Sequence, residues 1–221
     1  MGIGKGQEWG GETTDPPAVT IGGADADLAA AVAGAAPGAL VRFSPSPHSD
    51  VARALGLSGG DARVASRAVP MDALSLDGPR GAALAVNAVV SGVAPDRLDW
   101  RHVRRAVDVV VDGSSRTVPA TTVVVLVGQY LRGADVSPRG HPGDGVAEVQ
   151  IYGLAPGQRR AMRDRLGSGA HLPHPGISTQ RARRVEIRWH RPVPLEIDGR
   201  AVGQAATLTL CVVPGAYRLL V

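Results

Sequence analysis

The 221-residue chain is long enough for one large domain or two small ones, 44% of its residues are hydrophobic, and its formal net charge is +4. Its single cysteine, Cys211, excludes an intrachain disulfide and a thiolate metal cluster, so we expect a reducing, cytoplasmic location. Only 3% of the residues are aromatic, too few for extensive base stacking, and we therefore expect no nucleic-acid partner.

The basic residues are almost all arginine, because Lys5 is the only lysine among 24 basic residues. Such a bias is typical of a GC-rich genome, and it weakens arginine content as evidence for a nucleic-acid site. An anionic membrane surface remains a suitable partner for the positive charge.

Residues 1–17 are rich in Gly, Glu and Pro and show no hydrophobic periodicity, which predicts a disordered lead-in. This segment also lacks the apolar core of a signal peptide. The longest apolar run of the chain is far shorter than the roughly 20 residues of a membrane helix. We expect no transmembrane segment and at most a peripheral association with membranes.

Strand and helix patterns alternate over residues 18–57. The strand AVTIGG precedes the alanine-rich helix DADLAAAVAGAA, and the strand GALVRF precedes a short helix at about 49–56. This β-α-β-α order is typical of a parallel α/β layer. We therefore predict a small, truncated α/β domain of Rossmann-like type, a remnant of a nucleotide-binding domain, over residues 18–62.

Short strand patterns dominate residues 63–221, with one amphipathic helix at about 156–167. Turns are expected at Asp112-Gly113, Asp198-Gly199 and Pro214-Gly215. Alternation predicts two half-buried strands, one with Val149 and Ile151 opposite Glu148 and Gln150, and one in ARRVEIRWH. The second domain should therefore be a mostly antiparallel, β-sandwich-like domain.

The loop SPSPHSD, residues 44–50, places Ser46, His48, Ser49 and Asp50 together, but neighbours in one loop rarely form a catalytic triad. The simpler interpretation is that Ser49 or Asp50 caps the following helix. A phosphate site at a strand-to-helix turn is the better functional interpretation. Gly22 and Gly23 suit it in the first such turn, whereas Pro45 and Pro47 remove amide donors from the second.

Two further clusters could bind metal. His171 and His174 have ligand-like spacing, but no carboxylate stands close in sequence, and structural hydrogen bonding is the better explanation. Asp135, His141 and Asp144 could hold a hard cation through oxygen atoms, or could cap the turns of a tight loop. The arginine stripe of residues 181–188 is best explained as a solvated strand face.

In this order, the motifs resemble those of the bacterial diacylglycerol kinase-type lipid kinases, relatives of the sphingosine kinases. Gly22 and Gly23 match the family's GGDGT loop, and DVARALGL matches the end of its GTGNDFARxLGL segment. The stretch GQYLRGADVSPRGHPGDGVAEV is similar to the family's NGxYxGGGxxxxPxAxxDDGLLDV. The segment VPLEIDGRAVG is similar to its PxxxDGE turn.

The resemblance implies ATP and Mg²⁺ as cofactors and a diacylglycerol-like lipid as substrate. It places Gly22, Gly23, Asp25 and Asp50 at the nucleotide site. It also implies a structural Mg²⁺ bound by Asp144, the carbonyl of Val146 and His141.

Departures from the family pattern concern catalysis. GGDGT is replaced by GGADAD, GTGN by residues 46–49, and an acidic helix residue by Ala30. Arg200 stands where the family has its proposed general base, and a guanidinium cannot accept a proton, which leaves Asp198 as the weak catalytic candidate. The family also places a further strand-helix-strand-helix before GGDGT, whereas about seventeen residues precede it here.

Two functions of different classes follow. We expect a degenerate, non-catalytic family member that binds lipid or protein, because phosphoryl transfer depends on positioning and charge neutralisation at the lost loops. The alternative is an active ATP-dependent lipid kinase. An exposed edge of the shortened domain would favour a homo-oligomer or a partner chain.

Overall fold

The computed structural model describes residues 8–57, 66–78 and 81–221. Strands dominate, and thirteen of them form one continuous sheet while β10 and β11 form a separate hairpin. Their bounds are β1 Gly11–Glu12, β2 Val19–Gly23, β3 Ala39–Pro45, β4 Arg67–Gly78, β5 Gly81–Ala85, β6 Ala88–Gly92, β7 Arg105–Val111, β8 Ser114–Ala120, β9 Thr122–Leu126, β10 Tyr130–Leu131, β11 Ala134–Asp135, β12 Ala147–Tyr152, β13 Ile177–Ala182, β14 Arg184–Ile197 and β15 Arg200–Leu220. The helices are α1 Asp25–Ala33, α2 Asp50–Ala54 and α3 Arg159–Leu166, with 3₁₀ turns η2 Pro95–Arg97 and η3 Pro156–Gln158.

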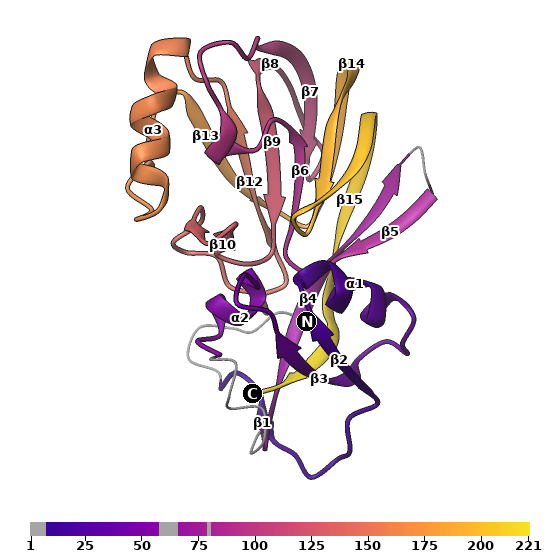
Figure 1. Ribbon diagram of the computed structural model, residues 1–221. Coiled ribbons are helices and arrows are strands. Elements are labelled where there is room, and N and C mark those ends of the chain that lie inside the picture. The colour runs from indigo at the N-terminus through magenta and orange to yellow at the C-terminus, as the bar shows by residue number, and fades with distance from the viewer. Residues whose placement is uncertain (1–7, 58–65, 79–80) are drawn as a thin grey trace.

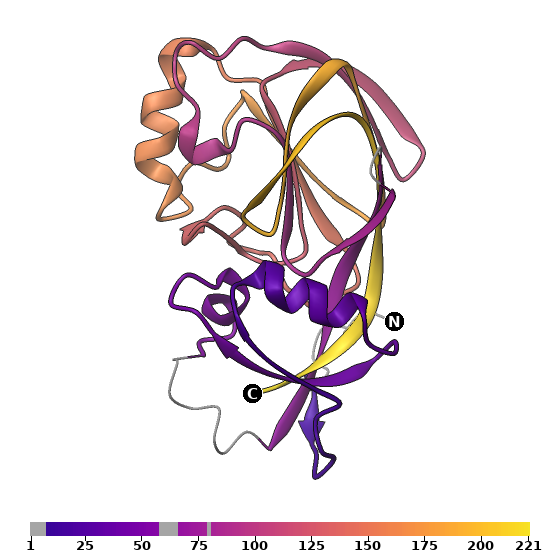
Figure 2. The same cartoon turned by 45° about the vertical axis from the view of Figure 1, so that its right-hand side comes forward.

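The larger part of the molecule is antiparallel. β14 pairs with β15, β6 and β7, and β9 pairs with β6 and β12. Figures 1 and 2 show how these strands curve around one another. They bury a mostly aliphatic cluster that includes Trp189, and a second cluster that includes Met162 and Leu166 of α3. The predicted β-sandwich-like domain is therefore confirmed, and its expected turn at Asp112-Gly113 joins β7 to β8 with positive φ at both residues.

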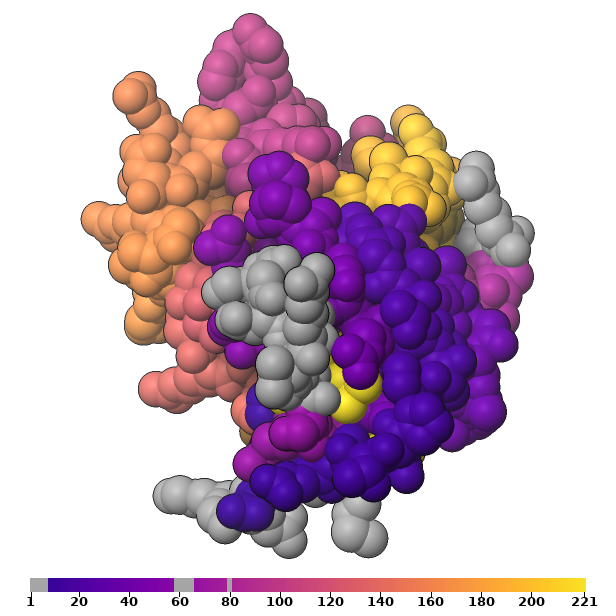
Figure 3. Space-filling model, turned by 60° about the horizontal axis from the view of Figure 1, so that its bottom comes forward, coloured from indigo at the N-terminus to yellow at the C-terminus, as the bar shows by residue number. Residues whose placement is uncertain are grey.

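The smaller part contains the predicted β-α-β-α order. β2 and β3 pair in parallel, and α1 packs Leu28 and Val32 against Val41 and Phe43. The alternating strand and helix patterns are confirmed, with α2 shorter than expected. In Figure 3 these N-terminal elements form most of one end of the molecule, and the yellow last strand shows between them.

The two parts share strands. The last residues of β15, Tyr217–Leu219, pair in parallel with β3 and in antiparallel with β4. β4 and β15 therefore run from the antiparallel part into the parallel layer, and the sheet is continuous across the sequence boundary expected at residues 62 and 63.

Three local expectations are wrong. Residues 8–17 are not a disordered lead-in, because β1 pairs with β4 and the indole of Trp9 donates a hydrogen bond to the Pro70 carbonyl, while residues 1–7 lie outside the described part. Gln150 is buried, since its amide binds the Val136 carbonyl and the hydroxyl of Tyr152. Pro214-Gly215 is an irregularity within β15 and ends no strand.

None of the described helices is long and apolar enough to cross a membrane.

Candidate functional site

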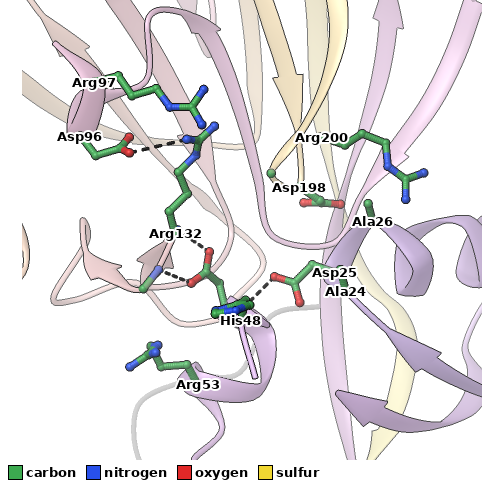
Figure 4. A pocket seen from close by; sticks show the side chains of 13 residues that line it. Ala24, Asp25, Ala26, His48, Arg53, Asp96, Arg97, Arg132, Asp198 and Arg200 are labelled. Carbon is green, nitrogen blue, oxygen red and sulfur yellow. Dashed lines mark hydrogen bonds and ion pairs between the residues drawn. The ribbon is translucent and has the colours of Figure 1, made fainter. Parts of the chain in front are cut away.

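A pocket of about 640 Å³ lies between the N-terminal layer and the antiparallel part (Figure 4). Four aspartates from different elements line it together with four arginines, and three of them, Asp25, Asp50 and Asp198, are predicted site residues. The complete lining is Ala24, Asp25, Ala26, His48, Asp50, Arg53, Asp96, Arg97, Arg132, Gly133, Asp198, Gly199 and Arg200. The structure thus brings three of the predicted site residues to one cavity.

Asp25 begins α1 and binds the N-terminus of α2. Its carboxylate accepts hydrogen bonds from the amides of Asp50 at 2.9 Å and Val51 at 3.3 Å, and from the hydroxyl of Ser49. Ser49 is the N-cap of α2, as predicted, and accepts from the amide of Ala52 at 3.0 Å. Burial raises the pKa of Asp25, although these hydrogen bonds oppose the increase. The free amides of this turn are therefore bound by the protein's own side chains.

Asp27 closes the first turn in a similar way. Its carboxylate accepts from the Ala24 amide at 2.9 Å and from the Arg200 guanidinium at 3.1 Å. The hydrogen bond from Ala24 is the main reason that the pKa of Asp27 lies below its usual value. Gly23 has a φ of +129°, and a Cβ atom at this position would lie 2.4 Å from an Asp27 carboxylate oxygen. The turn therefore requires glycine, because any side chain would clash with the carboxylate that caps it.

Gly22 takes no part in the pocket lining, and it pairs with Ser44 in the parallel ladder. The nucleotide site predicted at Gly22, Gly23, Asp25 and Asp50 therefore corresponds to two strand-to-helix turns in which carboxylates already accept the amides of Ala24, Asp50 and Val51.

Asp198 lies at the turn between β14 and β15, with a φ of +46°. Its carboxylate accepts from the amides of Val86 at 2.8 Å, Asn87 at 2.9 Å and Ala88 at 2.9 Å. Burial outweighs these hydrogen bonds and, with the nearby negative charge of Asp25, raises the pKa of Asp198 to about 7. The residue thus closes the connection between β5 and β6 and also faces the pocket.

Asp50 connects α2 to the β10–β11 hairpin. Its two carboxylate oxygens accept from the amides of Arg132 at 2.5 Å and Gly133 at 2.7 Å, and burial raises its pKa. The Arg132 side chain then binds Glu196 through two nitrogens and lies 3.5 Å from Asp96. Asp50 therefore fixes one wall of the pocket, while Arg53 stacks on Tyr130 beside it.

Positive charge surrounds the carboxylates. Arg97, Arg53 and Arg200 approach the pocket from different sides in Figure 4, and the Arg200 side chain is 62% exposed. Arg200 forms an ion pair with Asp27. The position that the family resemblance gives to a general base therefore holds a cation, which is bound to the first strand-to-helix turn.

The predicted Mg²⁺ ligands Asp144, Val146 and His141 lie together in the loop before β12, outside this pocket. Asp144 forms an ion pair with Arg181 and accepts from the Val146 amide, and His141 accepts from the Gly143 amide. An arginine on the carboxylate does not fit a divalent cation there. Within the described ranges, no three His, Cys, Asp or Glu side chains are grouped as metal ligands.

The two histidines expected to be metal-like or structural are separate. His174 accepts a hydrogen bond from the Gly176 amide at 2.9 Å, which is a structural role. His171 is buried, and burial lowers its pKa.

Sequence reasoning missed Asp27, Arg132 and Glu196. Asp27 stands in the quoted GGADAD, three residues after the N-cap Ala24, the spacing at which an acidic side chain can accept the N-cap amide. Arg132 and Glu196 are 64 residues apart, and no local pattern connects them.

The sequence from residue 57 to 221 matches the profile of the YegS C-terminal NAD kinase beta sandwich-like domain. This match spans most of the chain, and the chain belongs to that family. The search of curated proteins found no match.

Solved structures agree in fold. A diacylglycerol kinase from Bacillus anthracis strain Sterne is similar with a TM-score of 0.73 and 17% identity, over 91% of this chain and 75% of that chain. A second structure from the same strain, assigned to the same activity, gives a TM-score of 0.75 and 16% identity over 91% of this chain and 76% of that one. The resemblance to the diacylglycerol kinase-type lipid kinases is confirmed at the level of family and fold.

Proposed function

We propose that this chain is a non-catalytic member of the diacylglycerol kinase-type family, in which residues 18–62 are the remnant of a nucleotide-binding domain and the pocket binds a diacylglycerol-like lipid. One observation carries the proposal: Asp25 accepts the amide hydrogens of Asp50 and Val51 in the second strand-to-helix turn, and Asp27 accepts that of Ala24 in the first. A phosphate bound at either turn would have to displace a carboxylate from the amides. If the carboxylate stayed, its negative charge would repel the phosphate.

The second argument concerns proton transfer. A lipid hydroxyl needs a base within hydrogen-bonding distance as it attacks the phosphorus atom. Arg200 cannot accept that proton and is paired with Asp27. With neither a phosphate cradle nor a base at this position, the pocket supports binding better than turnover.

The test measures phosphatidic acid from diacylglycerol, Mg²⁺ and radiolabelled ATP, and ATP affinity by calorimetry. We expect no product above a protein-free blank and no heat of ATP binding. Arg200→Glu restores a carboxylate at the base position and should remain inactive, because Asp25 and Asp27 still hold the turn amides. Product formation by the wild-type chain that Asp50→Asn abolishes, in a variant whose circular dichroism is unchanged, would contradict the proposal.

An active lipid kinase is the second candidate, and Asp198 favours it. A carboxyl group that lines the pocket with a pKa near 7 could act as a general base at neutral pH. This candidate predicts a rate of phosphatidic acid formation that increases as pH rises through about 7.

A further inference from the structure

The segment between η2 and β7, residues 98–104, carries the two most exposed large hydrophobic side chains of the described residues; we name it the Trp100 loop. Trp100 is 69% exposed and Val103 is 74% exposed, whereas the next large exposed hydrophobic side chain among the described residues, Val213, reaches only 36%. An aromatic side chain presented beside a second apolar residue is typical of an interaction site.

The loop is held in place from behind. The buried guanidinium of Arg159, at the start of α3, donates to the carbonyls of Asp99 at 2.7 Å, His102, and Leu154 at 3.1 Å. Asp99 also accepts from the Arg101 amide at 2.9 Å. Trp100 and Val103 are therefore exposed by a loop whose backbone is fixed, and little order has to be gained on binding.

The charge around the apolar side chains is positive. Exposed arginines at positions 97, 101, 104 and 105 flank them, and the Arg101 guanidinium lies 5.0 Å from the centre of the Trp100 ring. The two acidic residues of the segment are engaged, Asp96 with Arg132 and Asp99 within the loop. An apolar centre within a basic rim is complementary to an anionic bilayer, where tryptophan favours the interface and arginine binds the headgroups.

The loop is connected to the pocket through η2. Asp96 and Arg97 of η2 line the pocket, and Trp100 follows three residues later. Figure 2 shows this segment beside α3, with which η2 packs. A bilayer bound at the loop would therefore contact the segment that leads directly from the pocket wall at η2 to β7.

We propose that the Trp100 loop docks this protein on an anionic lipid bilayer, with Trp100 and Val103 inserted at the interface and the flanking arginines bound to headgroup phosphates. The inference deepens the proposed lipid-binding function by naming the surface that meets the membrane. It rests on the proposed lipid-binding function for the reason why the protein would dock on a membrane. Binding to vesicles without diacylglycerol tests the docking loop separately from the pocket.

The experiment is flotation of the full chain with vesicles of phosphatidylcholine alone or mixed with phosphatidylglycerol, without diacylglycerol. We expect binding only to the anionic vesicles. Trp100→Ala should weaken it about tenfold or more, since roughly the burial free energy of an aromatic side chain is lost. Arg101→Gln should weaken it about fivefold, from about 1 kcal/mol for each basic residue near the surface.

Matched controls separate the loop from general effects. Val213→Ser and Arg188→Gln change exposed side chains of the same kinds on β15 and β14, and should leave vesicle binding unchanged. Trp100→Phe should retain binding but lose most of the fluorescence quenching by brominated lipid.

Two outcomes would overturn the inference. One is anionic-vesicle binding that Trp100→Ala leaves at the wild-type level. The other is the absence of vesicle binding together with RNA retention that depends on the same loop. A protein that floats with anionic vesicles but ignores diacylglycerol would support the docking loop and contradict the proposed pocket ligand.

Discussion

Aspartates close turns in both parts of this molecule, and the two groups differ in what they stabilise. Asp198 binds three consecutive amides at the centre of the antiparallel part, where β5 turns into β6. Asp25 and Asp27 bind the amides of the two strand-to-helix turns in the N-terminal layer. The first carboxylate holds the family fold together, whereas the other two satisfy donors that could otherwise bind an anion.

The comparison separates the contacts that hold the fold from those at the pocket. The antiparallel part is stabilised by a large aliphatic core and by Asp198, and neither depends on the strand-to-helix turns. In the N-terminal layer, carboxylates of the chain itself accept the amides of Ala24, Asp50 and Val51.

The largest effect is expected at Asp198. Asp198→Ala leaves three buried amides without their acceptor, and each unsatisfied group costs about 1–3 kcal/mol, so we expect a loss of about 3 kcal/mol or more in the free energy of unfolding. Urea denaturation measures it. Arg200→Ala changes an exposed side chain two residues away and should leave the urea midpoint nearly unchanged. If both variants lowered the midpoint equally, the Asp198 carboxylate would not have the stabilising role assigned to it.

A smaller effect is expected at Asp25, because α2 is short and retains Ser49 as a cap. Asp25→Ala should lower the free energy of unfolding by about 1–2 kcal/mol, the usual cost of removing a cap. It also frees two amides in the pocket, so a weak affinity for inorganic phosphate should appear in calorimetry. If the variant is as stable as the wild type, Asp25 does not hold the second turn.

A third prediction concerns the dependence of stability on pH. The pKa of Asp198 is raised from 3.8 to about 7 by burial, so between these values the folded state keeps a proton that the unfolded state releases. The free energy of unfolding should therefore decrease as pH rises from about 4 to about 7. Thermal melting across this range should show a decrease in Tm that Asp198→Asn reduces, and a wild-type Tm that rises over the same range would contradict the assigned pKa.

The sequence allowed much of the fold to be predicted. The alternation of AVTIGG, an alanine-rich helix and GALVRF gave the parallel layer, and period-two patterns gave the antiparallel strands. Local signals also identified Ser49 as a helix cap and Asp112-Gly113 as a turn. These features depend on neighbours in the chain, which is why a single sequence contains them.

Other features depended on residues far apart. Gln150 alternates like a solvent-facing residue but is buried by a loop, and the N-terminal Trp9 packs near His141. The pocket itself combines α1, α2, the β10–β11 hairpin and the β14–β15 turn. No periodicity indicates that Arg132 and Glu196 meet.

By itself, the sequence determined the class of fold, the family resemblance and the positions at which the chain departs from the family's motifs. Only the tertiary structure decided what the residues at these positions contact: Asp25 and Asp27 accept turn amides, Arg200 pairs with Asp27, and Trp100 is exposed by a loop fixed to Arg159. The physical reason is that residue type sets what a side chain can do. What the side chain actually does depends on its hydrogen bonds and its burial. These arise from contacts between residues that are tens of positions apart, and such contacts form only when the sheet closes.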